Sequence, residues 1–231
     1  MSETVDPAAP PARYSRVYGG ALLAAGGLAA IALLGWVAGL PRLADFRAGW
    51  VPMAPNTALC LLLLAVAAAL AERPWGQRPA IAAALAAALL SVTRVVEYLA
   101  PVELDVDRWF FRFAAGNVGL APVGRMALFT ALALAASSAA VLLFAWPGRR
   151  RWSEAMAGVL GAAVALEGLA FTIGYLHNGP LDRDAQGIPM ALPTAMALTA
   201  LGGALALRSA VAGVENQRRL ELATRRSEDL F

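Results

Sequence analysis

Long apolar segments separated by short polar stretches dominate the chain. Six of them cover residues 17–40, 52–71, 79–100, 125–146, 152–177 and 189–212. Each has roughly the 20 residues that a helix needs to cross a ~30 Å hydrocarbon core. Strands are excluded for these segments, because a lone helix satisfies its own backbone polar groups in lipid whereas a lone strand does not. The pattern predicts an all-α integral membrane protein, a bundle of six transmembrane helices.

Arginine residues gather at alternate ends of these segments. All 19 basic residues are Arg, and most of them lie within residues 13–16, 73–78, 149–151 and 208–226. The positive-inside rule places these four regions in the cytoplasm, together with both termini. The polar, Pro-rich residues 1–16 predict a disordered cytoplasmic tail. The arginines therefore indicate membrane topology, and no nucleic-acid partner is predicted.

A short motif recurs at the start of every second predicted helix. The pattern Met-Ala-x-x-Thr-Ala contains the pairs Met53 and Thr57, Met126 and Thr130, and Met190 and Thr194. One helical hairpin separates each copy from the next, which predicts three hairpin repeats, residues 17–72, 79–146 and 152–212. Within each copy the Met and Thr lie on one helix face, a turn apart. Two interpretations stay open: helix-start packing, or side chains that line a ligand pocket.

Three of the ionisable side chains within the predicted spans are candidate functional residues. Arg94 and Glu97 are three residues apart on one helix face and can form an ion pair. Glu167 lies about 15 Å below the outer end of its helix. Intramembrane charges are costly and usually face the bundle interior or a cavity. We therefore expect a small-molecule cavity in the outer half of the bundle, bordered by these three residues and by Trp36, Tyr98 and Tyr175.

That cavity is not the only interpretation of these charges. Arg94 and Glu97 can instead extend to the outer membrane surface. Glu167 is then protonated, paired with Arg94, or in contact with a cavity of its own.

Composition narrows the function further. Hydrophobic residues make up 59% of the chain and charged residues 15%, against about 25% charged residues in an ordinary soluble domain. One His and one Cys exclude metal sites built from clusters of these residues, and no catalytic motif occurs. His177 is expected to be a solvated interfacial residue. Less favoured alternatives are a haem with His and Met ligands, or a Cu(I) site of the three methionines. No cofactor is required.

Several of these segments resemble a known group of membrane domains. Residues 51–59, 104–109, 124–132 and 174–176 are similar to parts of the multi-helix N-terminal region of bacterial PAS-containing sensor histidine kinases and diguanylate cyclases. The resemblance covers about residues 30–231. It implies a sensory input domain in the bacterial inner membrane, without enzymatic activity of its own. The second and third motif copies lack a counterpart of Asn56, so a role of Asn56 is not shared by all three.

Residues 213–231 extend the last span without a proline. The extension has helix-forming composition and a weak apolar stripe at coiled-coil spacing. We expect a continuous signalling helix that pairs with a second copy as a homodimer and leads to a PAS domain. A basic tail held at anionic lipid headgroups is the alternative for this segment. The alternative function for the whole chain is a small transporter or channel, in which repeated hairpins with an intramembrane acid also occur.

Overall fold

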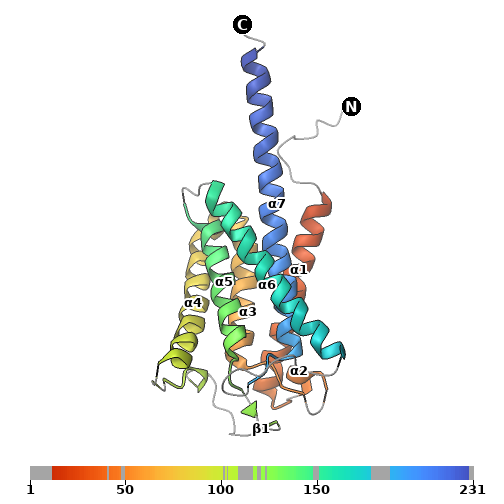
Figure 1. Cartoon of the computed structure of the whole chain (residues 1–231), viewed down its shortest axis with the longest axis vertical. Coiled ribbons are helices and arrows are strands. Elements are labelled where there is room, and N and C mark those ends of the chain that lie inside the picture. The colour runs from red at the N-terminus through yellow and green to blue at the C-terminus, as the bar shows by residue number, and fades with distance from the viewer. Residues whose placement is uncertain are drawn as a thin grey trace.

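Long helices form nearly all of the ordered framework (Figure 1). The computed structural model describes residues 12–40, 42–47, 50–100, 102, 104–108, 117–118, 121–122, 124–147, 151–177 and 188–228. Within these residues the long helices are α1 (Ala12–Ala38), α3 (Pro55–Ala71), α4 (Gln77–Leu99), α5 (Leu128–Ala145), α6 (Arg151–His177) and α7 (Leu192–Glu228). The short elements are α2 (Arg42–Asp45), the 3-10 helices η1 (Pro74–Gly76) and η2 (Val106–Arg108), and a two-residue antiparallel ladder of β1 (Asn117–Val118) with β2 (Ala121–Pro122).

Five of the described helices, α1, α4, α5, α6 and α7, are long and apolar enough to cross a membrane. The remaining long helix, α3, is equally apolar but has 17 residues, about 26 Å at 1.5 Å per residue. Large apolar side chains cover the outside of the bundle. Examples that are largely exposed are Leu23, Val37, Leu89, Leu99, Leu166 and Leu176. An apolar exterior of this kind suits lipid, and the described fold is that of an all-α, multi-pass membrane protein.

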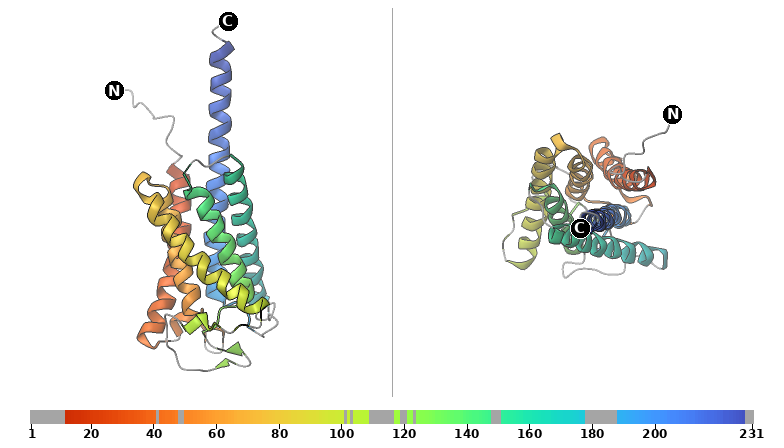
Figure 2. Two further views of the ribbon diagram at one scale, coloured as in Figure 1. Left: turned by 90° about the vertical axis from the view of Figure 1, so that its left-hand side faces the viewer. Right: turned by 90° about the horizontal axis from the view of Figure 1, so that it is seen from above.

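Neighbouring helices along the chain pack against each other. α1 contacts α3, α4 contacts α5, and α6 contacts α7; these pairs are joined by α3–α4, α5–α6 and α1–α7 contacts. α3, α5 and α7 also contact one another, so they line the bundle axis, which the view from above in Figure 2 shows for α7. We call the end from which α7 projects the inner end, and the end that carries α2 and the β-ladder the outer end (Figure 1).

The first helix begins earlier than the apolar pattern indicates. α1 starts at Ala12, so residues 12–16 are helical and do not belong to the expected disordered tail, whose residues 1–11 lie outside the described part of the chain. Tyr14 stacks on Tyr18, one turn further along, with ring centroids 5.6 Å apart. This contact gives the polar first turn a packing partner that hydrophobic periodicity does not reveal.

Candidate functional site

Each of the three motif methionines lies two residues before the start of a helix. Met53 precedes α3, Met126 precedes α5 and Met190 precedes α7, and all three are at most 1% exposed. Their carbonyls lie outside the helical hydrogen-bond pattern, and a buried carbonyl needs a donor. In every case a side chain of the preceding long helix donates. The bonds are Trp36 Nε1 to Met53 O at 2.8 Å, Arg94 Nε to Met126 O at 3.0 Å, and Tyr175 Oη to Met190 O at 2.8 Å.

The donor on α4 differs from the residue that the sequence placed beside Trp36 and Tyr175. Tyr98 lies near the outer end of α4, as Trp36 and Tyr175 do in α1 and α6, but Arg94, one turn earlier, makes the bond to Met126. The Tyr98 ring instead lies beside the guanidinium, 4.6 Å from Cζ to the ring centroid. A cation over an aromatic face is favourable, especially away from water. Tyr98 thus supports the donor.

The motif threonines are buried in the first turn of each helix. Thr57, Thr130 and Thr194 are each 2% exposed. The residue after each Thr donates its N–H to the carbonyl of the residue that follows each Met, at 3.0 Å in all three cases. These identical bonds start α3, α5 and α7 in the same way. Such burial suits helix packing, and a pocket lined by these side chains stays a prediction.

Arg94 is the centre of a buried group of charges at the outer end. Its Nη1 lies 2.9 Å from Glu97 Oε2, and its Nε lies 3.5 Å from Asp107 Oδ2. Arg94, Glu97 and Asp107 are only 5%, 9% and 3% exposed. Asp107 also accepts the Met126 N–H, at 3.3 Å to the nearer carboxylate oxygen. One guanidinium therefore holds two carboxylates and the chain that enters α5.

The same group of charges fixes the loop after α4 to the start of α3. The Val106 N–H donates to Glu97 Oε1 at 3.2 Å, and the Val106 carbonyl accepts from Asn56 Nδ2 at 2.8 Å. Asn56 is fully buried, and its Oδ1 has no hydrogen-bond partner in the described structure. We name Asn56, Arg94, Glu97 and Asp107 the outer cluster. Because it joins α3, α4, η2 and the start of α5, a change in it alters contacts of four segments.

Asp107 is the titratable member of the outer cluster that lies outside the membrane-spanning helices, in η2. Burial raises the pKa of its carboxyl from 3.8 to about 6, and this effect outweighs the opposing effects of Arg94 and of the Met126 N–H. A carboxyl with such a pKa changes its charge in a mildly acidic range. The outer cluster can therefore bind a proton.

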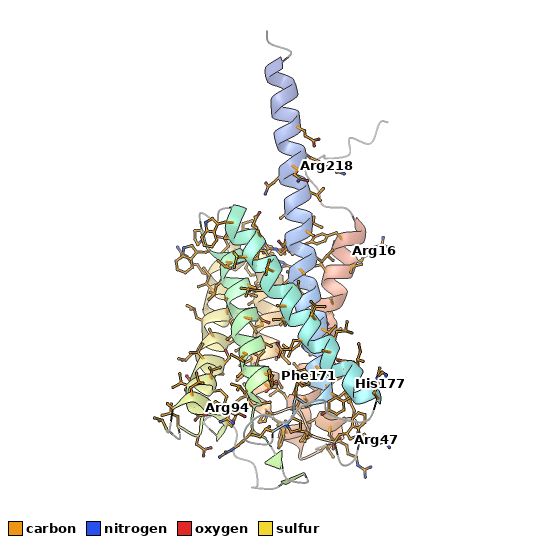
Figure 3. The ribbon with its side chains drawn as sticks, in the orientation of Figure 1. Arg16, Arg47, Arg94, Phe171, His177 and Arg218 are labelled. Carbon is orange, nitrogen blue, oxygen red and sulfur yellow. The ribbon has the colours of Figure 1, made fainter. Side chains whose placement is uncertain are left out.

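Glu167 lies apart from the outer cluster, on α6. Its Oε1 is buried without a hydrogen-bond partner in the described structure. Phe171, one turn nearer the outer end, packs on Phe129 of α5 with ring centroids 5.8 Å apart. The Arg94–Glu167 pair weighed from the sequence is not among the ion pairs of the described residues, since Arg94 pairs with Glu97 and Asp107. The arrangement in Figure 3 also separates the labelled Arg94 and Phe171.

The remaining candidates occupy separate places. Trp36, Arg94 and Tyr175 each donate to the motif methionine of a different hairpin. A single cavity bordered by all of them stays a prediction. His177 ends α6 and is exposed, with Nδ1 3.1 Å from the Ile173 carbonyl (Figure 3). Among the described residues, no group of three or more His, Cys, Asp or Glu side chains is placed to hold a metal ion. The interfacial position of His177 stays a prediction.

Sequence reasoning found Arg94 and Glu97 but missed Asp107 and underrated Asn56. The ion pair of Arg94 and Glu97 follows from their spacing on one helix. Asp107 lies in a loop, where no periodicity indicates its direction. One signal was available: a buried Arg with a single local carboxylate, followed by a loop rich in Asp. Comparisons of the chain with protein families, with curated proteins and with solved structures find no match.

Proposed function

We propose that this chain is the sensory input domain of a signalling protein in the bacterial inner membrane. In this proposal six spans, arranged as three hairpin repeats, detect a small ligand or a membrane state near the outer cluster. Helix α7 then carries the response to a cytoplasmic PAS domain and to a histidine kinase or diguanylate cyclase. The membrane domain itself catalyses no reaction.

The observation that carries this proposal is the continuity of α7. It is one helix of 37 residues from Leu192 to Glu228, about 55 Å long at 1.5 Å per residue. It begins just after the buried Met190 at the outer end, passes along the bundle axis and projects far beyond the inner end (Figures 1 and 2). A span alone needs only about 20 residues. The additional length connects the outer end mechanically with the far side of the membrane.

The outer cluster supports the location of the sensor. Buried charges are stable only in a geometry that pairs them well, because their desolvation is costly. A ligand or proton that changes this pairing therefore favours one arrangement of the surrounding segments over another. The three equivalent bonds to Met53, Met126 and Met190 support the hairpin repeats.

The excess of arginines toward the inner end, counted along the sequence, is what supports cytoplasmic termini, since exposed arginines (Arg42, Arg47 and Arg125) also lie at the outer end. Arg16, Arg73, Arg78 and Arg218 are exposed and belong to the inner ends of their helices or to the turn between α3 and α4. Figure 3 shows Arg16 and Arg218 toward the end from which α7 projects. An excess of arginines near the ends of spans favours the cytoplasmic side.

The proposed homodimer follows from the isolated position of the α7 extension. Beyond the bundle this part of α7 has no neighbouring helix in the views of Figures 1 and 2. An isolated helix of this length is marginal in water. A parallel contact with a second copy of α7 would stabilise it.

The described polar groups do not favour the alternative of a transporter or channel. Ser91, Ser137 and Ser138 are buried within the helices, yet each hydroxyl donates to a carbonyl four residues earlier in its own helix at 2.8 Å. Hydroxyls that are satisfied in this way reduce the exposed polar surface along the bundle interior.

The test changes the rotation of the α7 extension in the full-length protein. Insertions of one to four alanines after Gly213 rotate the distal helix by about 100° per residue. Gly213 is exposed, and no atom lies within 4 Å of a Cβ placed there. We expect autophosphorylation or cyclic dinucleotide synthesis to oscillate with insertion length and to recover near a whole turn. A Gly-rich insertion of the same lengths is the control, since it breaks the helix. Output that ignores the length of the alanine insertion contradicts the proposal.

A further inference from the structure

The backbones of helices α6 and α7 approach each other closely at three glycines, where any larger residue would clash. A Cβ atom on Gly168 would lie 2.6 Å from the Ala195 carbonyl oxygen, and one on Gly202 would lie 2.6 Å from the Gly161 carbonyl oxygen. At Gly161 it would lie 2.8 Å from the backbone nitrogen of Ala206. Backbones that approach so closely gain many van der Waals contacts, which is how helices associate in lipid. The two helices therefore form one packed pair.

Polar contacts hold the α6–α7 pair together at both ends. At the outer end Tyr175 of α6 donates to the Met190 carbonyl that precedes α7. At the inner end Ser209 Oγ donates to the Glu154 carbonyl at 2.7 Å, and Asn216 Nδ2 donates to Glu154 Oε2 at 3.2 Å. With both ends tied, α6 and α7 are expected to move together.

Arg208 connects this pair to the rest of the bundle. It lies on α7, is 8% exposed, and its Nε forms an ion pair with Glu72 Oε1 at the end of α3. Its guanidinium also lies over the Phe144 ring of α5, 4.1 Å from the centroid. In the described part of the chain, Arg208 thus supplies both an ion pair to α3 and a ring contact to α5.

Glu72, the partner of Arg208, lies at the inner end of α3, which is held by α1. Tyr18 of α1 donates its hydroxyl to the Ala68 carbonyl of α3 at 3.0 Å, one turn before Glu72. The inner end of α3 is thus fixed to α1. Arg208 lies about 24 Å along α7 from Leu192, close to the ~26 Å length of α3. The two partners therefore meet at the same depth, near the inner edge of a ~30 Å core.

We propose that Arg208 and Glu72 are positioning residues whose ion pair sets the register of the α6–α7 pair against α1, α3 and α5. Removing Glu72 leaves the charge of the buried Arg208 uncompensated in a poorly hydrated place. The close contacts within the α6–α7 pair persist, so the pair shifts as a unit. The proposal deepens the proposed function, because it names the contact through which α7 is held in a signalling state.

The test measures distances between spin labels in the purified chain in lipid nanodiscs. Cysteines that replace the exposed Gln217 on α7 and Arg78 on α4 report movement between the two parts. Cysteines that replace Gln217 and the exposed Ala155 on α6 report movement within the α6–α7 pair. Cys60 is buried, and the parent chain without added cysteines measures its background labelling. Mixing with unlabelled protein removes distances between copies.

We expect Glu72→Gln and Arg208→Met each to shift the 217–78 distance by about 2 Å, a usual size for helix shifts, or to broaden its distribution. The 217–155 distance should stay as in the parent. The exchange Glu72→Arg with Arg208→Glu should restore a narrow 217–78 distribution. Arg218→Gln, at an exposed arginine of the same helix, is the matched control and should change neither distance.

A parent-like 217–78 distribution in the Glu72→Gln variant overturns the proposal. Glu72 is exposed at the end of its helix, with 39% of its side chain accessible. The Glu72→Gln variant is therefore expected to fold, and it tests the proposal even where Arg208→Met fails to fold. An equal change in the 217–155 distance also overturns it, since α6 and α7 would then not move together. These readouts do not involve enzymatic output. A shifted register without any change in kinase or cyclase output would contradict the proposed function and leave the positioning role intact.

Discussion

Arg94 satisfies three different acceptors at once: Glu97, Asp107 and the Met126 carbonyl. A guanidinium suits this position because its planar set of N–H donors points in several directions and keeps its charge. A lysine would present a single ammonium group. At this scale the outer cluster is an arrangement in which one guanidinium joins three acceptors, and Asp107 is the member whose charge is easiest to change.

The Asp107→Asn variant should reduce the dependence of folding stability on pH. The pKa of Asp107 is raised to about 6 by burial, so the folded protein binds a proton between about pH 4 and pH 6 that the unfolded chain has released. This group therefore adds stability as the pH falls through 6. The gain between pH 7 and pH 5 is about 1 kcal/mol. Thermal unfolding in nanodiscs at several pH values should show that the variant lacks this gain.

Asp105→Asn is the matched control for that measurement. Asp105 lies two residues earlier in the same loop and is part-exposed. Its backbone is in the left-handed region, with φ of 49°, which Asn tolerates well. The control should keep the pH dependence of the parent. An Asp107→Asn variant with the full parental dependence would show that another group is responsible.

At the scale of elements, the way in which a helix begins and the surface on which it packs are set by different residues. The beginnings of α3, α5 and α7 depend on a buried carbonyl and a donor from the preceding long helix. The packing of α7 on α6 depends on the absence of side chains. Two neighbouring glycines of α7 show how local the packing requirement is. Gly202 faces α6, whereas no atom lies within 4 Å of a Cβ placed on Gly203.

Gly202→Ala should therefore destabilise the bundle, whereas Gly203→Ala should not. The new Cβ at Gly202 would lie 2.5 Å from the Ala165 nitrogen, and overpacking of this kind costs about 1–3 kcal/mol. At Gly203 the higher helix propensity of Ala is the main effect, at most about 1 kcal/mol in favour of folding. Thermal unfolding of the two variants under identical conditions measures the difference. Equal stabilities would show that α6 and α7 do not pack as described.

For the molecule as a whole, the apolar pattern was sufficient to predict an all-α membrane bundle with long helices, and the structure confirms this class. The pattern placed most helix ends within a few residues. It gave no sign that α3 would begin only after Ala54, because residues 52–54 are as apolar as the helix that follows. The joining of Asn56, Arg94 and Asp107 depends on tertiary contacts between distant segments. Neither periodicity nor spacing contains that information.

The orientation of the bundle has a direct test in intact cells. A cysteine in place of the exposed His177 at the outer end should react with a membrane-impermeant maleimide. One in place of Gln217 on the α7 extension should be protected until the cells are lysed, because the positive-inside rule puts this end in the cytoplasm. The parent chain should give little labelling, since Cys60 is buried. Labelling at Gln217 before lysis would reverse the topology.

The position of Arg208 along α7 has a geometric consequence. Sixteen residues separate it from Leu192 and twenty from Glu228, which makes two arms of about 24 Å and about 30 Å. A rigid rod held at that point is a lever with its fulcrum near the inner membrane surface. A sideways displacement of about 1 Å at the outer end then moves the far end by slightly more than 1 Å in the opposite direction. Such a lever delivers a small movement across the bilayer undiminished and with its direction reversed.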